Sequence, residues 1–383
     1  MSYLIDNASS VYVIQRGGRN LIVADDNTKF FCALRNTGSG QTVCMYRSDD
    51  AGQTWTPFEA GSITGLYQHV AIAADSTGLI HAIILSSGLS IQVWYRTFSP
   101  STNTWSAESL IVTTSGGASG RQHVDVAIGA DDLPQMVVCE YVTSRTASTY
   151  NIHYRKYNGA IWAMTTISTP NVNAYFPRII IAEPFTGAGI FPVICYAEEV
   201  TPLSMSLFCA YYNSGFGVVK TGALDTLGLF SNDSRDWTSL AKVVSGVRDN
   251  IHISYFTSTI FRHIWHSAPA AWGTWQTPET IAFAVAPTQF LTTDGLDLKL
   301  WRQNAGSVLL YTKLLGGSWD AGVTVHSGAN ANVRGHWAAN HARRLGHHLD
   351  FVFRDGSSYR YGKLPLNGAR RTLTENLSSR AFT

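Results

Sequence analysis

Residues 92–96 read Gln92-Val93-Trp94-Tyr95-Arg96, and a polar turn then leads to Trp105. This unit, a strand ending in an aromatic residue, a polar turn and usually a Trp, recurs along the chain. Its other copies are residues 43–47 with Trp55, 152–156 with Trp162, 208–212 with Phe216, 263–266 with Trp275, 309–312 with Trp319, and 358–361 without a trailing aromatic residue. The anchor aromatics recur about every 52 residues, which is the size of a four-stranded blade or slightly more.

A second pattern lies upstream in each unit. The segment His69-Val70-Ala71-Ile72-Ala73-Ala74-Asp75, a short turn and residues 79–84 align without gaps on residues 123–129 and 133–138. Residues 20–24 and 178–182 fit the same frame. Short apolar runs rich in β-branched residues and bounded by turn residues predict strands, and no stretch has a convincing helical period.

Seven such units predict about 28 strands, arranged as an all-β, seven-bladed β-propeller with four antiparallel strands in each blade. Continuous apolar inner strands are typical of strands buried between neighbouring blades. A solenoid is the alternative, but it needs capping repeats, and none is evident. The last unit lacks a good fourth strand, so we expect the N-terminal segment, including Ser10-Val11-Tyr12-Val13-Ile14, to close the ring.

We expect one domain spanning residues 1–383, because no linker interrupts the repeat. The predicted parts are blades at 17–60, 66–112, 120–168, 174–222, 234–282, 287–326 and 333–366, a closing strand at 3–16 and a C-terminal tail at 367–383.

Composition restricts the possible partners. Charged residues make up only 14% of the chain, and the formal net charge is +2. The sequence therefore contains no basic patch of the kind that indicates binding to nucleic acid. No apolar run approaches the roughly 18 residues of a membrane span, so no membrane insertion is expected. The sequence shows no secretory signal, which predicts synthesis in the cytoplasm and release, if any, by a route such as lysis. Low charge with many aromatics suits a glycan partner, a protein partner or a place in a larger homo- or hetero-oligomeric assembly.

The five cysteines are Cys32, Cys44, Cys139, Cys195 and Cys209. Most lie in apolar strand runs, which predicts buried free thiols; pairs 32/44 and 195/209 facing each other across neighbouring strands are the alternative. None has the spacing of a metal site, and His341 with His347 and His348 lacks a supporting set of carboxylates. We therefore expect no metal and no cofactor.

One copy of the unit carries a sharper motif, Ser48-Asp49-Asp50-Ala51-Gly52-Gln53-Thr54-Trp55. It resembles the Asp-box of the bacterial neuraminidase repeat, and residues 99–105 and 315–319 look like eroded copies. The resemblance implies a sialidase-like propeller in which this turn lies on the face opposite the active site. Physically, the Asp50 carboxylate is suited to accept backbone N–H bonds, and Gly52 can adopt a positive φ. Ser48, Asp50, Gly52, Thr54 and Trp55 are therefore expected to be structural.

The same resemblance argues against true sialidase activity. Sialidases use three arginines, a Tyr/Glu pair and an Asp acid, with one arginine in an early Arg-Ile-Pro motif. Here Arg16-Gly17-Gly18-Arg19 has no Ile-Pro after it. The segment Phe176-Pro177-Arg178-Ile179 contains the three residue types in a different order, and it lies in the predicted fourth blade.

Residues at the start of each innermost strand converge around the central channel, whatever their separation in sequence. The predicted ligand-binding set is Arg19, Tyr67, Gln68, His69, Arg121, His123, Tyr175, Arg178, Arg235, Trp237, Arg334 and His336. Aromatic faces stack on sugars, Arg presents a fork of donors to carboxylate or sulfate, and His can act as a general acid or base. The alternative is that these are ordinary rim residues bonded to neighbouring blades. The repeat does not place Glu140, Glu183, Glu198 or Glu199 at the rim, so catalytic residues stay unassigned.

The sequence thus favours a non-catalytic recognition propeller that binds a glycan or a protein, as a phage or viral structural or receptor-binding component. One alternative is a polysaccharide lyase or glycoside hydrolase that uses the same rim, and another is a purely structural assembly subunit. The fold alone does not choose among them.

Overall fold

The computed structural model describes strands, turns and connections, with no helix among the described residues. These are residues 2–6, 19–24, 26–36, 41–61, 66–87, 90–115, 123–143, 148–170, 172–183, 189–201, 204–213, 215, 217–228, 238–245, 248–257, 260–267, 272, 274–283, 289–293, 297–304, 307–314, 317–327, 333–335, 348–355 and 358–365.

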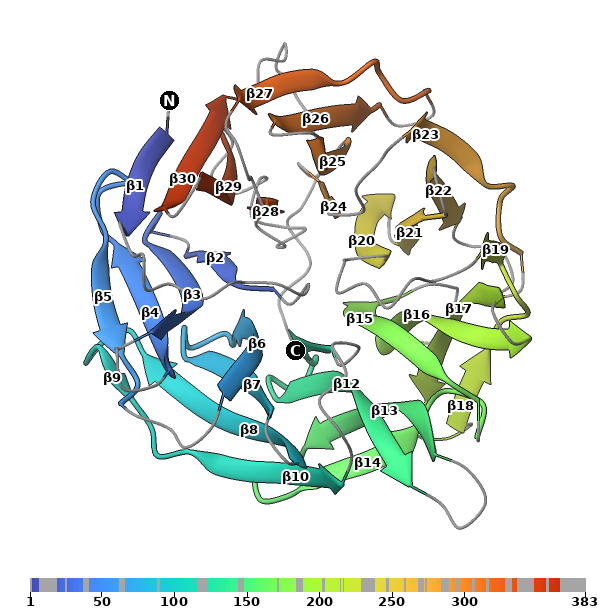
Figure 1. The fold of residues 1–383 in the computed structure, drawn as a ribbon, viewed down its shortest axis with the longest axis horizontal. Helices are drawn as coiled ribbons and strands as arrows, with labels where there is room; N and C mark the ends of the chain where they lie inside the picture. Colours follow the sequence, from blue (N-terminus) through green and yellow to red (C-terminus); the bar gives the residue numbers. More distant parts are fainter. Residues whose placement is uncertain are drawn as a thin grey trace.

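Seven antiparallel sheets form a ring, so the prediction of a seven-bladed β-propeller is confirmed (Figure 1). The first three blades comprise β2 (Leu21–Val23), β3 (Lys29–Asn36), β4 (Gln41–Ser48) and β5 (Thr56–Glu59); β6 (Leu66–Ala74), β7 (Ile80–Ser87), β8 (Ser90–Ser99) and β10 (Ser109–Ser115), with β9 (Thr104–Trp105) beside β8; and β11 (Val124–Ile128), β12 (Pro134–Thr143), β13 (Ser148–Tyr157) and β14 (Trp162–Thr166).

The remaining blades have the same order. They comprise β15 (Ala174–Ala182), β16 (Phe191–Thr201), β17 (Ser204–Asn213) and β18 (Gly217–Lys220), with β19 (Asp225–Gly228) beside β17; β20 (Thr238–Ser245), β21 (Arg248–Phe256), β22 (Ile260–His266) and β23 (Glu279–Phe283); β24 (Gln289–Thr293), β25 (Leu298–Asn304), β26 (Ser307–Lys313) and β27 (Val323–Ser327); and β28 (Val333–Gly335), β29 (His348–Asp355), β30 (Ser358–Pro365) and β1 (Ser2–Asp6).

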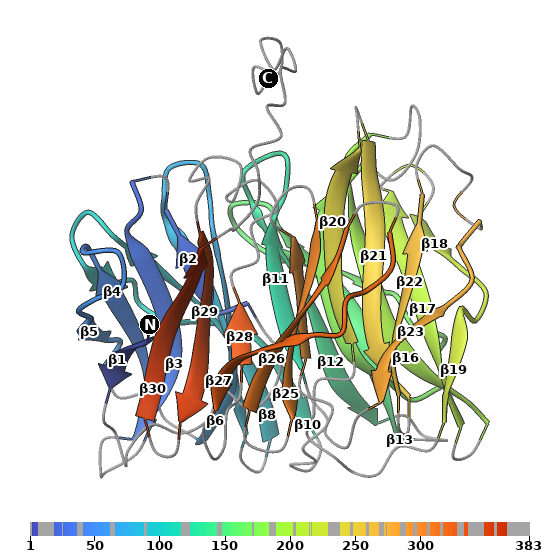
Figure 2. The ribbon, with the colours of Figure 1, turned by 90° about the horizontal axis from the view of Figure 1, so that it is seen from above.

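The first strand of each blade lies nearest the centre and the fourth lies outside, and seen from the side the strands cross the thickness of the ring (Figures 1 and 2). Because every blade repeats this order, all first strands begin on one face, here called the entry face. The turns between first and second strands and between third and fourth strands lie on the opposite, turn face.

The ring closes through the N-terminal strand, as predicted. Strand β1 pairs antiparallel with β30, with Ser2 opposite Gly362 and Tyr3 opposite Tyr361. Residues 10–14 lie outside the described part of the chain, so the strand that closes the ring is Ser2–Asp6. Asp6 then accepts a hydrogen bond from the Tyr46 hydroxyl of the first blade at 2.7 Å. A second link, Lys29 Nζ to Asp350 Oδ1 at 2.9 Å, joins the same two blades.

The cysteines are buried and free, as expected. Cys195 lies directly opposite Cys209, whereas Cys44 lies opposite Ala33 and Cys32 opposite Met45. Burial raises the pKa of the Cys195 thiol to about 12, so these thiols act as small apolar side chains.

Four of the trailing Trp residues contact the preceding blade. Trp55 packs on Tyr361 of the last blade, with ring centroids 5.5 Å apart. Trp162 packs edge-on against Tyr95 at 5.3 Å, and the Trp105 and Trp319 indole N–H groups donate to Phe58 O and Glu279 Oε1 at 3.0 Å each. The tryptophan of the repeat therefore joins neighbouring blades, and in this way the aromatic repeat contributes to closing the propeller.

The turn before Trp55 is held by Asp50. Its carboxylate accepts the Gln53 N–H at 2.9 Å, the Thr54 N–H at 2.8 Å and the Thr54 hydroxyl at 2.6 Å. Removal from water opposes ionisation, but these bonds and one from Ser48 outweigh it and lower the pKa of Asp50 to about 2. Gly52 has φ of 88°, and a Cβ placed there lies 2.1 Å from the Tyr361 ring.

We predict that Gly52→Ala destabilises the ring more than Gly78→Ala does. Both glycines have positive φ, 88° and 85°, but a Cβ at Gly78 meets nothing within 4 Å. Backbone strain costs about 1–2 kcal/mol at either position, and overpacking against Tyr361 adds about 1–3 kcal/mol at Gly52 alone. Denaturant unfolding of the two variants measures the difference, and equal losses would show that the Tyr361 contact does not matter.

Candidate functional site

The predicted ligand-binding residues fall into two groups. Arg121, Arg235, Trp237 and His336, together with the side chains of Tyr67, Gln68 and Arg334, lie outside the described part of the structure. Arg19, His69, His123, Tyr175 and Arg178 are described, and all five come from the first strands of the first four blades or the residues just before them.

These described residues pack inward. His69, His123 and Arg178 are 3%, 0% and 2% exposed, and Tyr175 is 4% exposed. The His69 and His123 rings lie 5.1 Å apart, and Phe176 packs edge-on against His123 at 4.7 Å. No pattern in the sequence indicates this burial, because it follows from the register of the strands.

Two β-bulges produce the inward arrangement. The register of β6 shifts between Tyr67 and His69, and that of β15 shifts between Tyr175 and Arg178, where Phe176 has φ of 58°. A bulge inserts an extra residue and re-aims the side chains around it. His69 and Phe176 are thereby both brought into contact with His123.

Arg19 belongs to a polar link among three blades. Its guanidinium lies 3.8 Å from Asp125 Oδ1 and donates to the Ile179 carbonyl. Asp125 also accepts the N–H groups of Ile179 and Val126 at 3.0 Å each. Burial lowers the pKa of Arg19. The negative charge of Asp125 acts against this shift, and the positive charge of Arg178 adds to it. The link joins the first, third and fourth blades, and Asp125, a lone charge in an apolar run, was its signal in the sequence.

An aromatic run leads from this buried centre to the surface of the entry face. Tyr175 contacts Phe176 at 6.0 Å and Tyr150 at 5.3 Å, and Tyr150 contacts Tyr141 at 5.0 Å. Tyr141 and Tyr150 lie opposite each other on β12 and β13, and both are half-buried. The prediction missed this pair, although two tyrosines flanking one hairpin could have indicated it.

A fixed amide and carboxylate lie beside Tyr150. Asn173 Oδ1 accepts the Tyr150 N–H at 3.1 Å, and Asn173 Nδ2 donates to Glu199 Oε2 at 2.7 Å. The Glu199 N–H returns a bond to the Asn173 carbonyl at 2.8 Å. Asn173 and Glu199 are both half-buried. Tyr141, Tyr150, Asn173 and Glu199 are called the tyrosine site below.

The other three glutamates considered from the sequence have different roles. Glu140 forms a buried, bidentate ion pair with Arg155, with Nη2 2.9 and 3.1 Å from its two oxygens. Glu198 is 3% exposed and bonds to the Lys220 ammonium. Glu183 follows β15 on the turn face. Within the described part of the chain, Glu199 is therefore the one of the four that presents a carboxylate on the entry face without an ion pair.

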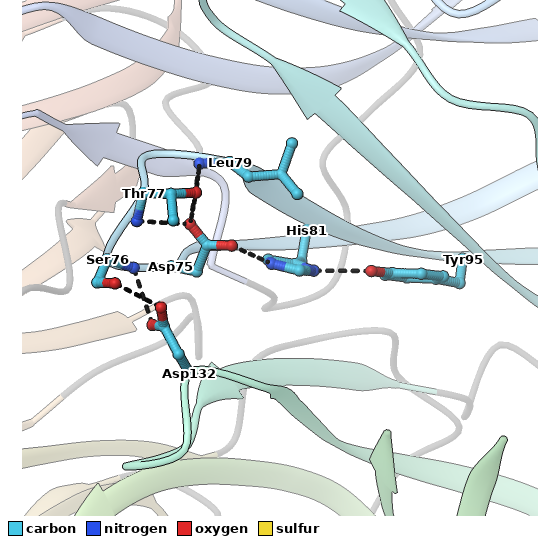
Figure 3. Close-up of polar contacts among 7 residues, drawn as sticks. All are labelled: Asp75, Ser76, Thr77, Leu79, His81, Tyr95 and Asp132. Atoms are coloured by element: carbon cyan, nitrogen blue, oxygen red, sulfur yellow. Dashed lines mark hydrogen bonds and ion pairs between the residues drawn. The ribbon is translucent and has the colours of Figure 1, made fainter. Parts of the chain in front are cut away.

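On the turn face, Asp75, His81 and Tyr95 form a relay (Figure 3). His81 Nε2 lies 3.0 Å from Asp75 Oδ2, and His81 Nδ1 lies 2.8 Å from the Tyr95 hydroxyl. Burial raises the pKa of Tyr95 to about 12, which keeps the phenol protonated and makes it a poor base or nucleophile. Asp75 also accepts the Leu79 N–H at 3.0 Å, and the Ser76 N–H reaches Asp132 of the next blade at 2.8 Å. The relay therefore holds the turn between β6 and β7 and ties it to the third blade.

A second histidine cluster joins the fifth and sixth blades. His252 Nδ1 lies 3.0 Å from His263 Nε2, and His263 Nδ1 lies 2.6 Å from Glu279 Oε1, which Lys313 Nζ also contacts at 2.9 Å. Burial lowers the pKa of both histidines, and the positive charge of Lys313 lowers both values further. At His263, the hydrogen bond and charge of Glu279 act in the opposite direction and raise the pKa. Among the residues described, no group of three or more His, Cys, Asp or Glu side chains could hold a metal ion.

We predict that stability falls as the pH drops below about 6.5, the ordinary pKa of His. The folded pKa values of His252 and His263 are lowered, so below pH 6.5 the unfolded chain binds more protons than the folded chain. The pKa of Glu279 is also lowered, because bonds from His263 and Lys313 outweigh burial, so its contribution is lost only at lower pH, as its folded pKa is passed.

Unfolding curves between pH 8 and pH 5 measure this slope, which is about 1.4 kcal/mol per pH unit for each proton taken up. The double variant His252→Asn, His263→Asn should lower stability at pH 8 and flatten the curve below pH 6.5. An unchanged slope in the double variant would show that other groups cause the acid sensitivity.

No family model matches the chain, and no curated protein matches it. Solved structures do match. The BP39L lectin from Burkholderia pseudomallei superposes with a TM-score of 0.67 at 12% identity over 92% of this chain and 95% of that one. The polysaccharide lyase Uly1 superposes with a TM-score of 0.57 at 10% identity over 93% and 91%.

A NanB sialidase from Streptococcus pneumoniae matches with a TM-score of 0.45 at 12% identity over 94% of this chain and 71% of that one. The structural neighbours are thus lectin, lyase and sialidase β-propellers, and at these identities the likeness shows the fold. In the described part of the chain, no helix is long and apolar enough to cross a membrane.

Proposed function

We propose that this protein is a non-catalytic recognition propeller that binds a glycan at the tyrosine site on its entry face. The observation that carries the proposal is the half-buried pair Tyr141 and Tyr150, held beside the fixed amide of Asn173 and the carboxylate of Glu199.

Sugar recognition needs both kinds of group. The C–H face of a pyranose packs on an aromatic ring, and its hydroxyls need donors and acceptors that are already oriented. Tyr150 is braced from below by Tyr175, which is 4% exposed, so its ring is fixed before a ligand arrives. Asn173 bonds both Tyr150 and Glu199, so the polar groups are positioned relative to the aromatic ones. Such pre-organisation lowers the entropy cost of binding.

The described groups give weaker support to an enzyme. A general acid or base must reach the substrate within hydrogen-bond distance. His69 and His123 are 3% and 0% exposed, and the Asp75–His81–Tyr95 relay lies on the turn face with its phenol protonated. A lyase or hydrolase therefore stands as an outcome of the test rather than a second proposal.

Low charge is also compatible with a protein partner or a place in a virion. That idea rests on the composition and is the weaker alternative, because the tyrosine site combines aromatic and polar groups as a sugar site does.

We predict that Tyr141→Ala weakens glycan binding about tenfold or more, because losing one stacked ring removes at least about 1.4 kcal/mol of binding free energy. A glycan array with neutral and acidic glycans identifies the ligands, and calorimetry on the best one measures the change. Tyr157→Ala is the matched control, since Tyr157 is also half-buried but lies on the turn face, where its hydroxyl bonds Gly159 O at 2.9 Å.

Product analysis accompanies the binding measurement. Binding without product, lost in Tyr141→Ala and kept in Tyr157→Ala, supports the proposal. Cleavage of a bound polysaccharide would replace it with the enzyme, and absence of any glycan ligand would favour a protein partner.

A further inference from the structure

Glu199 has an unusual position for a carboxylate in this chain. Its Oε2 accepts a bond from Asn173 Nδ2 at 2.7 Å, and among the described residues no cation pairs with it. Its side chain is half-buried rather than freely solvated. Oε1 is therefore the free acceptor oxygen of a carboxylate that Asn173 orients and links to the Tyr150 backbone.

Among the described residues, three cations of the third and fourth blades are already committed to other partners. Lys220 bonds the Glu198 carboxylate and Thr169 Oγ1, the latter at 2.9 Å, and lies 4.0 Å from the centre of the Phe208 ring. Arg155 forms its buried pair with Glu140, and Arg178 is 2% exposed and donates to Pro177 O at 3.0 Å. The charge that the described residues present at the tyrosine site is therefore negative.

A negative acceptor selects its ligand in two ways. A carboxylate has acceptor sites only, so it binds groups that donate, and adjacent sugar hydroxyls supply two O–H donors. Hydrogen bonds to a charged acceptor are about twice as strong as neutral ones. A uronate, sialate or sulfate group placed there would instead meet a like charge, which disfavours the wrong partner.

We infer that the tyrosine site takes neutral, hydroxyl-rich glycans and rejects anionic ones, with Glu199 as the residue that sets this preference. The inference rests on the proposed function, and it reverses the acidic ligand that the arginines in the sequence suggested. Asn173 is a positioning residue, because it orients the Glu199 carboxylate.

The test compares binding of neutral glycans and of their counterparts oxidised to uronates at C6, by wild type and by Glu199→Gln. Gln keeps the size of Glu and one acceptor oxygen but loses the charge. Wild type should bind the neutral form at least about tenfold more tightly than the uronate. Glu199→Gln should weaken neutral binding about tenfold, as expected on losing a charged hydrogen bond, and narrow the ratio of the two affinities.

Salt supplies a second measurement, because like-charge repulsion at a partly exposed site is screened. Raising the ionic strength should bring the affinities of wild type for the neutral glycan and for the uronate closer together. In Glu199→Gln the ratio of the two affinities should stay unchanged. Glu183→Gln is the matched control, since it makes the same charge change in the same blade but on the turn face, and its ratio should equal that of wild type.

The outcomes separate this inference from the proposed function. If uronates bind as tightly as neutral glycans and both are lost in Tyr141→Ala, the site is right and the inference is wrong. The inference is also wrong if Glu199→Gln leaves the ratio of the two affinities unchanged. If no glycan binds, or binding survives Tyr141→Ala, the proposed function itself fails.

Discussion

The contact of trailing tryptophans with the preceding blade, made by Trp55, Trp105, Trp162 and Trp319, is the interaction on which the ring depends. Each blade is a small sheet that is not expected to be stable alone, so its stability comes from its neighbours. At the closing junction Trp55 and Tyr361 pack together, and Gly52 leaves no room between the turn and the Tyr361 ring. The Lys29–Asp350 and Tyr46–Asp6 bonds complete that junction. With β1 and β30 paired in one blade, opening the ring requires several contacts to break together.

Closure also decides which polar groups remain for a ligand. On the turn face, Asp50 and Asp75 accept backbone N–H groups of their own turns. Around the channel, Asp125 and Arg19 link three blades, and in that role Asp125 is fully buried and Arg19 half-buried. Such groups cannot also bind a ligand without leaving a buried polar atom unpaired, at a cost of about 1–3 kcal/mol. Among the described residues, polar and aromatic groups without such a structural role remain on the outer part of the entry face, where Tyr141, Tyr150 and Glu199 lie, as the proposed glycan site requires.

This division explains what could be predicted from the sequence. The fold was predictable because its determinants are local: an aromatic residue, a turn and a Trp recur, and apolar strands carry the register. The entry-face side chains were not, because a gap-free alignment of residues 69–75 on 123–129 assumes that every strand is regular. The bulges before His69 and Arg178 break that assumption and turn His69 and Phe176 onto His123. The tyrosine site depends on a pairing between Tyr150 and Asn173 of the next blade, which no local pattern records.

The shared propeller fold therefore determines function less than the burial and bonding of individual side chains do. A lectin and a polysaccharide lyase both superpose on this fold at 12% and 10% identity, so the fold alone does not choose between binding and catalysis. In this chain a charge is rare, and nearly every described carboxylate on the entry side has a cation or several N–H donors. Keeping Glu199 half-buried without a cation among the described residues costs solvation free energy, which a single amide bond from Asn173 only partly offsets. An acceptor maintained at such a cost and linked through Asn173 to Tyr150 is consistent with the proposed ligand, which donates hydrogen bonds.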